Sequence, residues 1–232
     1  MLFRSVYKLT VNGVVDTAST PNQIAENTSR TFTAFIRLAG GVKFEAFLDI
    51  TGSAVQGLLD AEKYQNNQPD IVAYASQFTS RLVFTDSGHE NYGGRMSGWI
   101  KPPTSGSYQF FIRSDDSSQL FLSTDDKPEN ATLIAEETGC CGPFEDLDAN
   151  PTATETSQPV ELAAGKSYYI SAIWKEGGGG DYCDVAWRKV GDPAVPRALP
   201  YISGAVLETI APPNTFTLPT DRKSTRLNSS HT

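Results

Sequence analysis

The sequence predicts an all-β protein, an antiparallel β-sandwich with one short helix. Short apolar runs recur along most of the chain, and in GSYQFFIRS, residues 106–114, apolar and polar side chains alternate with the period of two of a strand. Clusters of Gly, Pro and Asn separate these runs at intervals typical of sandwich folds. Many short strands joined by tight turns favour two packed antiparallel sheets.

The composition limits the classes of partner. The net charge is −8, from 27 acidic and 19 basic residues, which disfavours nucleic acid because its phosphates would be repelled. The sequence has no run of about 18 apolar residues, and residues 1–13 lack an apolar core of signal-peptide length, so we expect no membrane insertion. Only His89 and His231 carry imidazoles, which argues against histidine-rich metal sites. A neutral ligand or a cation suits this balance best.

The first 38 residues are predicted to form strands of a separate unit. Asn12-Gly13, between the apolar runs of VYKLTVNGVVDT, is a strong signal for a two-residue hairpin. Residues 29–38, SRTFTAFIRL, form a further predicted strand. Because so few residues bury little apolar surface, we expect residues 1–38 to be the C-terminal remnant of an upstream β domain.

Residues 41–205 contain the remaining predicted elements, as one domain. A strand at FEAFLDI leads to AVQGLLDAEKY, residues 54–64, which we expect to form the short helix with Ser53 as its N-cap. After a turn at residues 66–70, apolar segments occur around Tyr74 and Phe78. Further strands are predicted in RMSGWI, SYQFFIRS, QLFLS, TLIAEET, PVEL, YYISAIW and VAWRKV.

The C-terminal region differs from the rest of the chain. Residues 206–220 include the Pro-rich APPNTFTLP, which predicts a linker. Residues 221–231, DRKSTRLNSSH, are similar to the translation of a short-read sequencing adapter. We therefore expect residues 221–232 to be a sequencing artefact with no part in the fold.

Three cysteines allow more than one redox state. Adjacent cysteines rarely bond each other because the ring that would close is strained. We therefore expect a disulfide between Cys183 and either Cys140 or Cys141, with the third thiol free. Three reduced thiols in a cytosolic protein are the alternative that the spacing leaves open. A disulfide would indicate an oxidising, extracellular environment.

Two stretches carry candidate ligands for a cation. Asp115 and Asp116 stand at the end of the predicted strand GSYQFFIRS, where rigid backbone can hold two carboxylates, although Asp and Ser are also common in ordinary turns. In WKEGGGGDYCDVAW four glycines lie between Glu176 and Asp181, and Asp184 follows. Glycines permit positive φ and close backbone approach, so this loop can direct carbonyl oxygens at a hard cation. The alternative is a flexible hairpin linker.

No arrangement of residues indicates catalysis. The adjacent Asp115 and Asp116 cannot bracket a glycosidic bond as the two carboxyls of a glycosidase must. A serine hydrolase would depend on His89, and no nucleophile motif accompanies it. The stretch that begins at Asp146 imitates an EF-hand loop but has Pro151 where that loop needs glycine. The four glycines are not followed by the Lys-Ser or Lys-Thr of a phosphate loop. We therefore expect no enzymatic activity.

The chain resembles the PA-fourteen (PA14) domain, the β-sandwich named for anthrax protective antigen, which implies a sandwich of the jelly-roll type. The resemblance covers residues 41–205 and is carried, in order, by NYGGRMSGWI, PPTSGSYQFFIRSDDSSQLFLSTDD, LAAGKSYYISAIWKEGGGGD and VAWR. In lectins of this family, two adjacent aspartates joined by a cis peptide hold Ca²⁺, and the ion holds sugar hydroxyls. The resemblance implies that Asp115 and Asp116 are this pair and that the Gly177–Asp181 loop is the second calcium-binding loop.

The resemblance also implies a set of site residues. The implied Ca²⁺ ligands are Asp115, Asp116, Asp181 and the backbone of Gly179 and Gly180. The implied ligand-binding residues are Asp115, Asp116, Gly178, Asp181, Tyr182 and Asp184. An exposed sugar site also needs an aromatic surface. The candidates are Tyr182, Tyr92 and Phe144, each of which could equally belong to the core.

The implied function is calcium-dependent carbohydrate binding by a lectin-like adhesion module of a larger protein. The STDD and KEGGGGD stretches are similar to those of large bacterial surface and secreted proteins, so we expect an extracellular or cell-surface location. The expected partners are a glycan and other domains of the same chain. Members of this family also serve as structural spacers or as accessory modules of enzymes, and both alternatives stay open.

Overall fold

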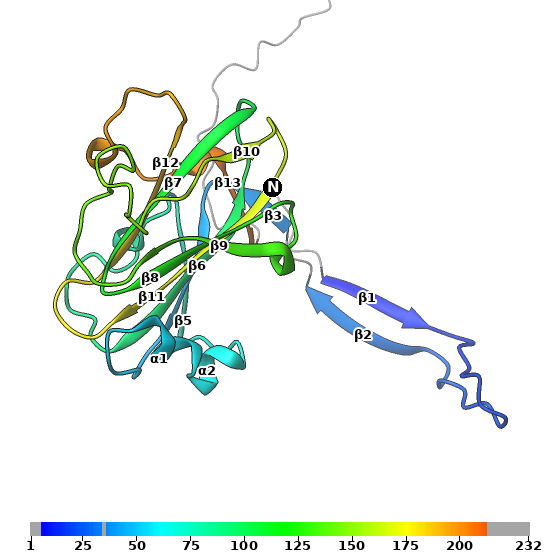
Figure 1. Ribbon diagram of the computed structural model, residues 1–232. Helices are drawn as coiled ribbons and strands as arrows, with labels where there is room; N and C mark the ends of the chain where they lie inside the picture. The colour runs from blue at the N-terminus through cyan, green and yellow to red at the C-terminus, as the bar shows by residue number, and fades with distance from the viewer. Residues whose placement is uncertain (1–5, 34–35, 213–232) are drawn as a thin grey trace, which may run out of the picture.

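Two antiparallel sheets pack against each other and make up the body of the protein (Figure 1). The computed structural model describes residues 6–33 and 36–212. Neighbouring strands in these ranges run antiparallel throughout. The prediction of an all-β antiparallel sandwich is therefore confirmed.

The larger sheet has the strand order β3-β13-β6-β11-β8-β9, and β4 and β5 extend it beside β6. Each half of β6 has its own neighbour on that side, because Ile100 lies opposite Leu207 of β13 and Gly93 lies opposite Phe47 of β4. The bounds of these strands are β3 Ile36–Ala39, β4 Val42–Phe47, β5 Ile71–Ala75, β6 Tyr92–Ile100, β8 Ser118–Ser123, β9 Ala131–Glu137, β11 Tyr168–Glu176 and β13 Leu207–Ala211.

The smaller sheet has the order β10-β7-β12. Its strands are β10 Val160–Leu162, β7 Gly106–Asp115 and β12 Tyr182–Lys189. The chain passes from the smaller to the larger sheet between the end of β7 and the start of β8. It passes back through residues 177–181, between β11 and β12. The predicted aspartate pair and the predicted glycine loop are therefore two of the connections between the sheets at one end of the sandwich.

The main core lies between the sheets. On β7, the side chains of Tyr108, Phe110 and Ile112 belong to this core, as their alternation in the sequence predicts. Across from them, the larger sheet contributes Met96, Leu120, Ile170, Ala172 and Trp174, among others. Fully burying one such large apolar side chain stabilises the fold by about 1.5–3 kcal/mol.

Two short helices replace the single predicted one, α1 (Val55–Leu59) and α2 (Glu62–Gln65). The prediction of Ser53 as N-cap is wrong, because Ala54 holds that position and offers no side-chain acceptor. The Ser117 hydroxyl, far away in the sequence, accepts from the Val55 N–H at 3.0 Å and donates to the Ser53 carbonyl at 2.6 Å. None of the helices among the described residues is long and apolar enough to cross a membrane.

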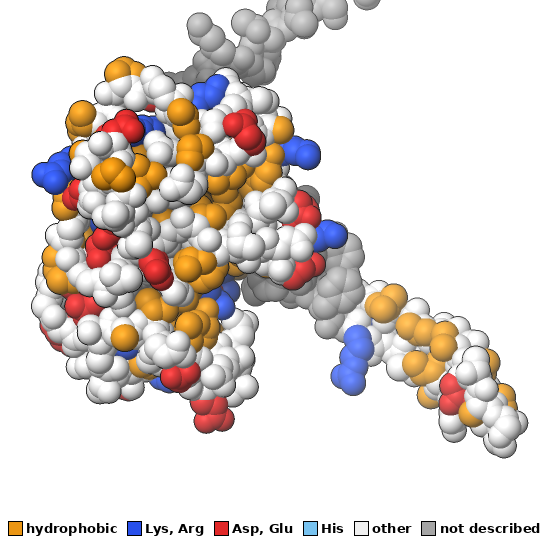
Figure 2. All heavy atoms as spheres, viewed as in Figure 1, with side chains coloured by type: hydrophobic (Ala, Val, Ile, Leu, Met, Phe, Trp, Pro, Cys, Tyr) orange, Lys and Arg blue, Asp and Glu red, His pale blue; other side chains and the backbone are white. Residues whose placement is uncertain are grey.

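A hairpin of β1 (Val6–Val11) and β2 (Thr28–Thr33) projects from the sandwich (Figure 1). The predicted two-residue turn at Asn12-Gly13 is wrong. Val11 pairs with Thr28, so Asn12 and Gly13 begin a long loop instead. The Asn12 side chain accepts a hydrogen bond from the backbone of Asn27 and so closes the base of this loop. Hydrophobic side chains are visible along the hairpin (Figure 2), and the exposed ones include Leu9, Val14 and Val15.

Two predicted domain borders differ from the structure. β3, expected to end the upstream domain, pairs with β13 in the larger sheet, with Ala39 opposite Glu208. β13 itself was expected to be linker, yet Leu207 lies in the main core. The rest of the predicted linker from residue 213 and the adapter-like residues 221–232 lie outside the described residues.

Candidate metal and ligand site

The aspartate pair and the glycine loop meet, as the sequence predicts. Tyr182, the first residue of β12, lies opposite Asp115 in the smaller sheet, so the loop that precedes it is held beside the pair. The peptide bond between Asp115 and Asp116 is cis, as the resemblance implied. The backbone N–H of Asp116 donates to the carbonyl of Lys175 at 2.8 Å, which ties the pair to the end of β11.

The glycines allow the loop to approach the carboxylates closely. The Gly177 N–H donates to Oδ2 of Asp116 at 3.0 Å. A Cβ atom at Gly180 would collide with Oδ2 of Asp115, so a larger residue at that position would displace either the Asp115 carboxylate or the loop. Gly179 has a φ of +119°, a conformation that other residues rarely adopt. Its N–H donates to Glu90 at 3.1 Å.

A third carboxylate, Glu176, joins the pair. One oxygen each from Asp115, Asp116 and Glu176 can be chosen so that all three lie within 4.8 Å of one another. The Glu176 side chain is completely buried, and neither of its carboxylate oxygens has a hydrogen-bond partner among the described residues. Glu176 stands directly beside the glycines in the sequence but was not among the predicted ligands. Its position at the end of a strand, directly before the glycine loop, could have identified it as a candidate ligand.

The electrostatics of this acidic cluster, defined as Asp115, Asp116 and Glu176, favour a bound cation. Burial, followed by repulsion from Asp116, Asp115, Asp181 and Glu90, raises the pKa of Glu176 to about 8. Burial and then the Asp116 charge also raise the pKa of Asp115. Calcium prefers carboxylate and carbonyl oxygens, and an ion among these three side chains would satisfy the unpartnered oxygens of Glu176. The residues present therefore fit such an ion.

Asp181, an implied calcium ligand, lies in a different group. Its Oδ2 accepts a hydrogen bond from the backbone N–H of His89 at 3.0 Å, and its neighbours are His89 and Asp86. Burial raises the pKa of Asp181, although the hydrogen bond and charge of His89 act in the opposite direction. The structure thus places Asp181 beside the acidic cluster, close enough to raise the pKa of Glu176, with its own partners.

The structure does not bring Asp184 to the acidic cluster. Asp184 lies within β12, is completely buried, and accepts a hydrogen bond from the Thr79 hydroxyl at 2.6 Å. Arg81 and Arg113 also donate to it, at 3.2 and 3.1 Å. Tyr182, in contrast, lies next to the cluster and is half-buried, with the Arg81 guanidinium 3.9 Å above its ring.

Two of the aromatic candidates for a sugar-contacting surface belong to the core. Tyr92 is completely buried, and its hydroxyl accepts a hydrogen bond from the Trp174 indole at 3.1 Å. Phe144 is 2% exposed and packs against Phe111. Neither ring can stack on a ligand, so Tyr182 is the remaining one of the three candidates.

The predicted disulfide is wrong. Cys140 and Cys141 bond each other, and Cys183 is a free thiol. The reason lies in β12, where Cys183 belongs to the main core and is completely buried, whereas Cys140 and Cys141 are exposed. Burial raises the pKa of the Cys183 thiol well above its usual value.

The loop with the disulfide nevertheless lies beside the acidic cluster. The Cys141 N–H donates to the carbonyl of Ser114 at 2.9 Å, directly before Asp115. An oxygen of Asp115 and both sulfur atoms lie within 4.8 Å of one another. The expected proximity of this loop to the glycine loop is therefore present without the expected bond.

A family comparison decides what this region is. The model of the PA14 domain family matches residues 80–189, which contain the aspartate pair, the disulfide and the glycine loop. This region is a PA14 domain. Two solved structures with the same fold are the PA14 sugar-binding domain of an RTX adhesin and the PA14 domain of the antifreeze protein MpAFP. Their TM-scores are 0.53 and 0.51 at 16% and 13% identity, over 74% of this chain and 99% and 91% of theirs.

Curated relatives of the PA14 domain are parts of much larger proteins. The mouse N-acetyl-beta-glucosaminyl-glycoprotein 4-beta-N-acetylgalactosaminyltransferase 1 is 34% identical over 156 residues, which is 64% of this chain. Mouse fibrocystin-L is 28% identical over 131 residues, which is 51% of this chain. The chain spans 14% of the length of the transferase and 3% of fibrocystin-L.

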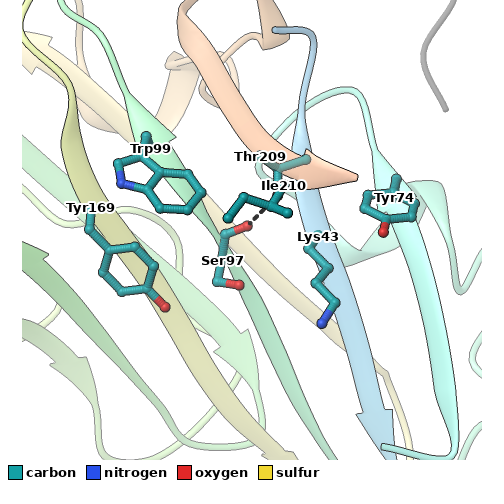
Figure 3. Close-up of a pocket in the computed structure, with 7 residues that line it drawn as sticks. All are labelled: Lys43, Tyr74, Ser97, Trp99, Tyr169, Thr209 and Ile210. Carbon is teal, nitrogen blue, oxygen red and sulfur yellow. Dashed lines mark hydrogen bonds between the residues drawn. The ribbon is translucent and has the colours of Figure 1, made fainter. Parts of the chain in front are cut away.

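A separate hollow lies on the outer face of the larger sheet (Figure 3). Its volume is about 310 Å³, and it is lined by Lys43, Tyr74, Ser97, Trp99, Tyr169, Thr209 and Ile210. Trp99 and Tyr169 meet edge to face at 5.6 Å, and the Trp99 indole donates to the carbonyl of Asp126. None of the site residues predicted for the PA14 domain lines this hollow.

Proposed function

We propose that this PA14 domain is a calcium-dependent carbohydrate-binding module of a larger extracellular or cell-surface protein. The observation that carries the proposal is the acidic cluster, in which buried Glu176 has two unpartnered oxygens beside Asp115 and Asp116. A buried carboxylate is costly unless it is paired or coordinates a metal. The domain binds its ligand without catalysing a reaction.

In this proposal, Ca²⁺ takes carboxylate oxygens from Asp115, Asp116 and Glu176 and carbonyl oxygens from Gly179 and Gly180. Calcium accepts 6–8 oxygen ligands, so positions are left for water or for sugar hydroxyls. The ion, rather than a large pocket, then supplies most of the affinity for the sugar. The fold shared with a domain described as sugar-binding, that of the RTX adhesin, supports this proposal.

The sugar ring also needs an apolar contact, which we assign to the Cys140–Cys141 disulfide and Tyr182. The disulfide is exposed and lies next to Asp115, whereas Tyr92 and Phe144 are buried. Sulfur is soft and polarizable, which suits an apolar contact. If two hydroxyls of the sugar bind the ion, the adjacent face of the sugar ring would lie over the disulfide and Tyr182.

A second candidate function is a structural spacer with a buried ion. The burial of the acidic cluster favours it, because Asp115 is 9% exposed and Glu176 is completely buried. The small share of the transferase that the chain matches is compatible with a spacer or with an accessory module of an enzyme. In a spacer, the ion would stiffen the connections between the sheets without contacting a ligand.

Calorimetric titration of Ca²⁺ tests the metal assignment. Asp116→Ala and Glu176→Gln should each weaken Ca²⁺ binding by about tenfold or more, since even partners outside the first coordination sphere contribute that much. The control is Asp148→Ala, an exposed aspartate in another loop, which should bind like the wild type. Equal affinity in all four proteins would overturn the assignment.

A glycan array with and without EDTA separates the two functions. The lectin proposal expects binding to at least one class of glycan that EDTA abolishes and added Ca²⁺ restores. Calcium binding without any hit on a broad array would favour the spacer. Glycan binding that persists in EDTA would contradict the role of the ion in recognition.

A further inference from the structure

A second group of potential metal ligands lies beside the acidic cluster. It consists of Asp86, His89 and Asp181, and we call it the histidine cluster. Asp86 and His89 come from the loop before β6, and Asp181 ends the glycine loop before β12. We propose that the histidine cluster binds a divalent transition-metal ion, for which Zn²⁺ is the probe.

The distances within the histidine cluster suit a tetrahedral ion. Nδ1 of His89 lies 3.4 Å from Oδ1 of Asp86 and 3.7 Å from Oδ2 of Asp181. Zinc binds nitrogen and carboxylate oxygen at about 2.0–2.1 Å, which in a tetrahedron separates two ligand atoms by about 3.4 Å. An ion between the three side chains therefore requires only small movements of them.

Unpartnered buried atoms point to a ligand at this position. Nδ1 of His89 is shielded from solvent and has no hydrogen-bond partner among the described residues. The same holds for Oδ1 of Asp181, whose side chain is 1% exposed. Buried polar atoms are nearly always paired, and each exception calls for an unseen water, ion or other cause. A metal ion held by Nδ1 would account for a buried nitrogen that has two carboxylates nearby and no hydrogen bond.

The cluster is held in place before any ion arrives. The His89 ring stacks on Phe84, with centroids 3.7 Å apart and the planes 3° from parallel. The backbone N–H of His89 donates to Oδ2 of Asp181 at 3.0 Å, and the backbone N–H of Gly88 donates to Oδ1 of Asp86 at 3.3 Å. Asp86 is 73% exposed, so an ion has an entry path and a position open to water or another ligand.

The ligand types select a different ion from the one assigned to the acidic cluster. Calcium prefers oxygen ligands, whereas imidazole nitrogen suits Zn²⁺ and its neighbours in the first transition row. The acidic cluster has three carboxylates and no nitrogen, and the histidine cluster has one imidazole with two carboxylates. The domain thus offers two adjacent sites of different selectivity.

The test is calorimetric titration of Zn²⁺ into the full chain in saturating CaCl₂, without reductant. Wild type and a His231→Ala control should bind one Zn²⁺ with similar affinity, because His231 is the only other histidine. His89→Ala and Asp86→Asn should each weaken binding by about tenfold or more. Asp86 is exposed, so Asp86→Asn tests the site even if His89→Ala disturbs the stacking on Phe84.

Two further measurements keep the outcomes distinct. Nitrogen-15 spectra of the imidazoles should show Zn²⁺ shifting Nδ1 of His89, which an ion pair between His89 and the two aspartates would not explain. Asp116→Ala leaves the histidine cluster intact and should retain Zn²⁺ binding even if it loses Ca²⁺. Three outcomes would each overturn the proposal: no Zn²⁺ binding by the wild type, wild-type Zn²⁺ affinity in both His89→Ala and Asp86→Asn, or loss of Zn²⁺ binding in His231→Ala or Asp116→Ala.

Discussion

Two neighbouring residues of β11, Lys175 and Glu176, are an amine and a carboxyl group in completely buried positions. The Lys175 ammonium donates to the backbone carbonyl of Glu176 at 2.8 Å. Burial lowers the pKa of Lys175, while the charges of Glu176 and Asp116 act in the opposite direction. Three carboxylates, this ammonium and a divalent ion together carry no net charge, so a bound Ca²⁺ would complete the neutralisation that Lys175 begins.

At the residue scale, we predict that the disulfide contributes to sugar binding and not to calcium binding. Replacing Cys140 and Cys141 together by serine should weaken glycan affinity severalfold, because the apolar contact beside Asp115 is lost. Calcium affinity should stay within about twofold, because no sulfur atom is a proposed ligand. Glycan and Ca²⁺ titrations of the double variant check both parts.

The control for this prediction counts thiols. An alkylating reagent should label one thiol per unfolded, unreduced wild-type chain, Cys183, and none in the native protein, where that thiol is buried. Three labelled thiols in the unfolded chain would show that the disulfide does not form, and unchanged glycan affinity in the double variant would contradict its role.

Single residues also show where sequence reasoning succeeds and where it fails. Asp115, Asp116 and the glycines could be located because carboxylates and glycines at strand ends are a local signal. Glu176 was missed because its burial depends on how β11 packs in the sheet. The position of Cys183 could have been predicted, since Cys183 and Val185 alternate along β12 with both side chains in the main core.

At the scale of elements, β4 and β6 are joined by an internal ion pair. Glu45 lies opposite Arg95 in the register, is 1% exposed, and accepts from Nε of Arg95 at 2.7 Å. Lys43 contacts its other oxygen. Burial acts to raise the pKa of Glu45, but the hydrogen bonds and charges of Arg95 and Lys43 outweigh it and lower the pKa below 4.5.

The sign of this pKa shift sets a stability prediction. Because the pKa of Glu45 is lower in the folded state, its contribution to the free energy of unfolding is present above the unfolded-state pKa and is lost as the pH falls through the folded-state pKa. Glu45→Gln should therefore lower the free energy of unfolding by about 2 kcal/mol at pH 7, and by less below pH 4. Urea unfolding at both pH values measures it, with Asp148→Asn as control. A difference that stays constant down to pH 3 would contradict the assignment.

The elements that were predicted wrongly from the sequence are those that depend on long-range contacts. Pro-rich composition after residue 211 made β13 look like linker, although its place in the sheet depends on pairing with β3 and β6. The start of α1 was misassigned because its hydroxyl partner, Ser117, belongs to the connection between the sheets. Strand alternation, in contrast, is local, and β7 formed as predicted.

At the scale of the whole molecule, the β1–β2 hairpin contributes none of its described residues to the hydrophobic cores. A two-stranded hairpin alone is marginally stable in water. Its exposed side chains include Leu9, Val14 and Val15, whereas the sandwich encloses a continuous core. The two-residue turn predicted at Asn12-Gly13 does not form, because the pairing of β1 with β2 overrides the local turn preference of these two residues.

We predict that amide hydrogen exchange separates the two parts of the chain. Amides of β1 and β2 should exchange by local opening, at rates that hardly depend on global stability. Amides in the middle of β6 and β11, which have strand neighbours on both sides, should exchange far more slowly. Exchange measured by mass spectrometry after proteolysis distinguishes them. Equal protection of the hairpin and β11 would show that the hairpin is part of the cooperative unit.

The pairing of β3 with β13 has a consequence for how the domain can be joined to other chains. Ile36 lies opposite Ala211, so the chain enters and leaves the sandwich on adjacent antiparallel strands. Entry and exit points this close allow a domain to be inserted into one surface loop of a host protein without separating the ends of that loop. The same unit can thus be carried as an insertion within another fold as readily as in a linear string of domains.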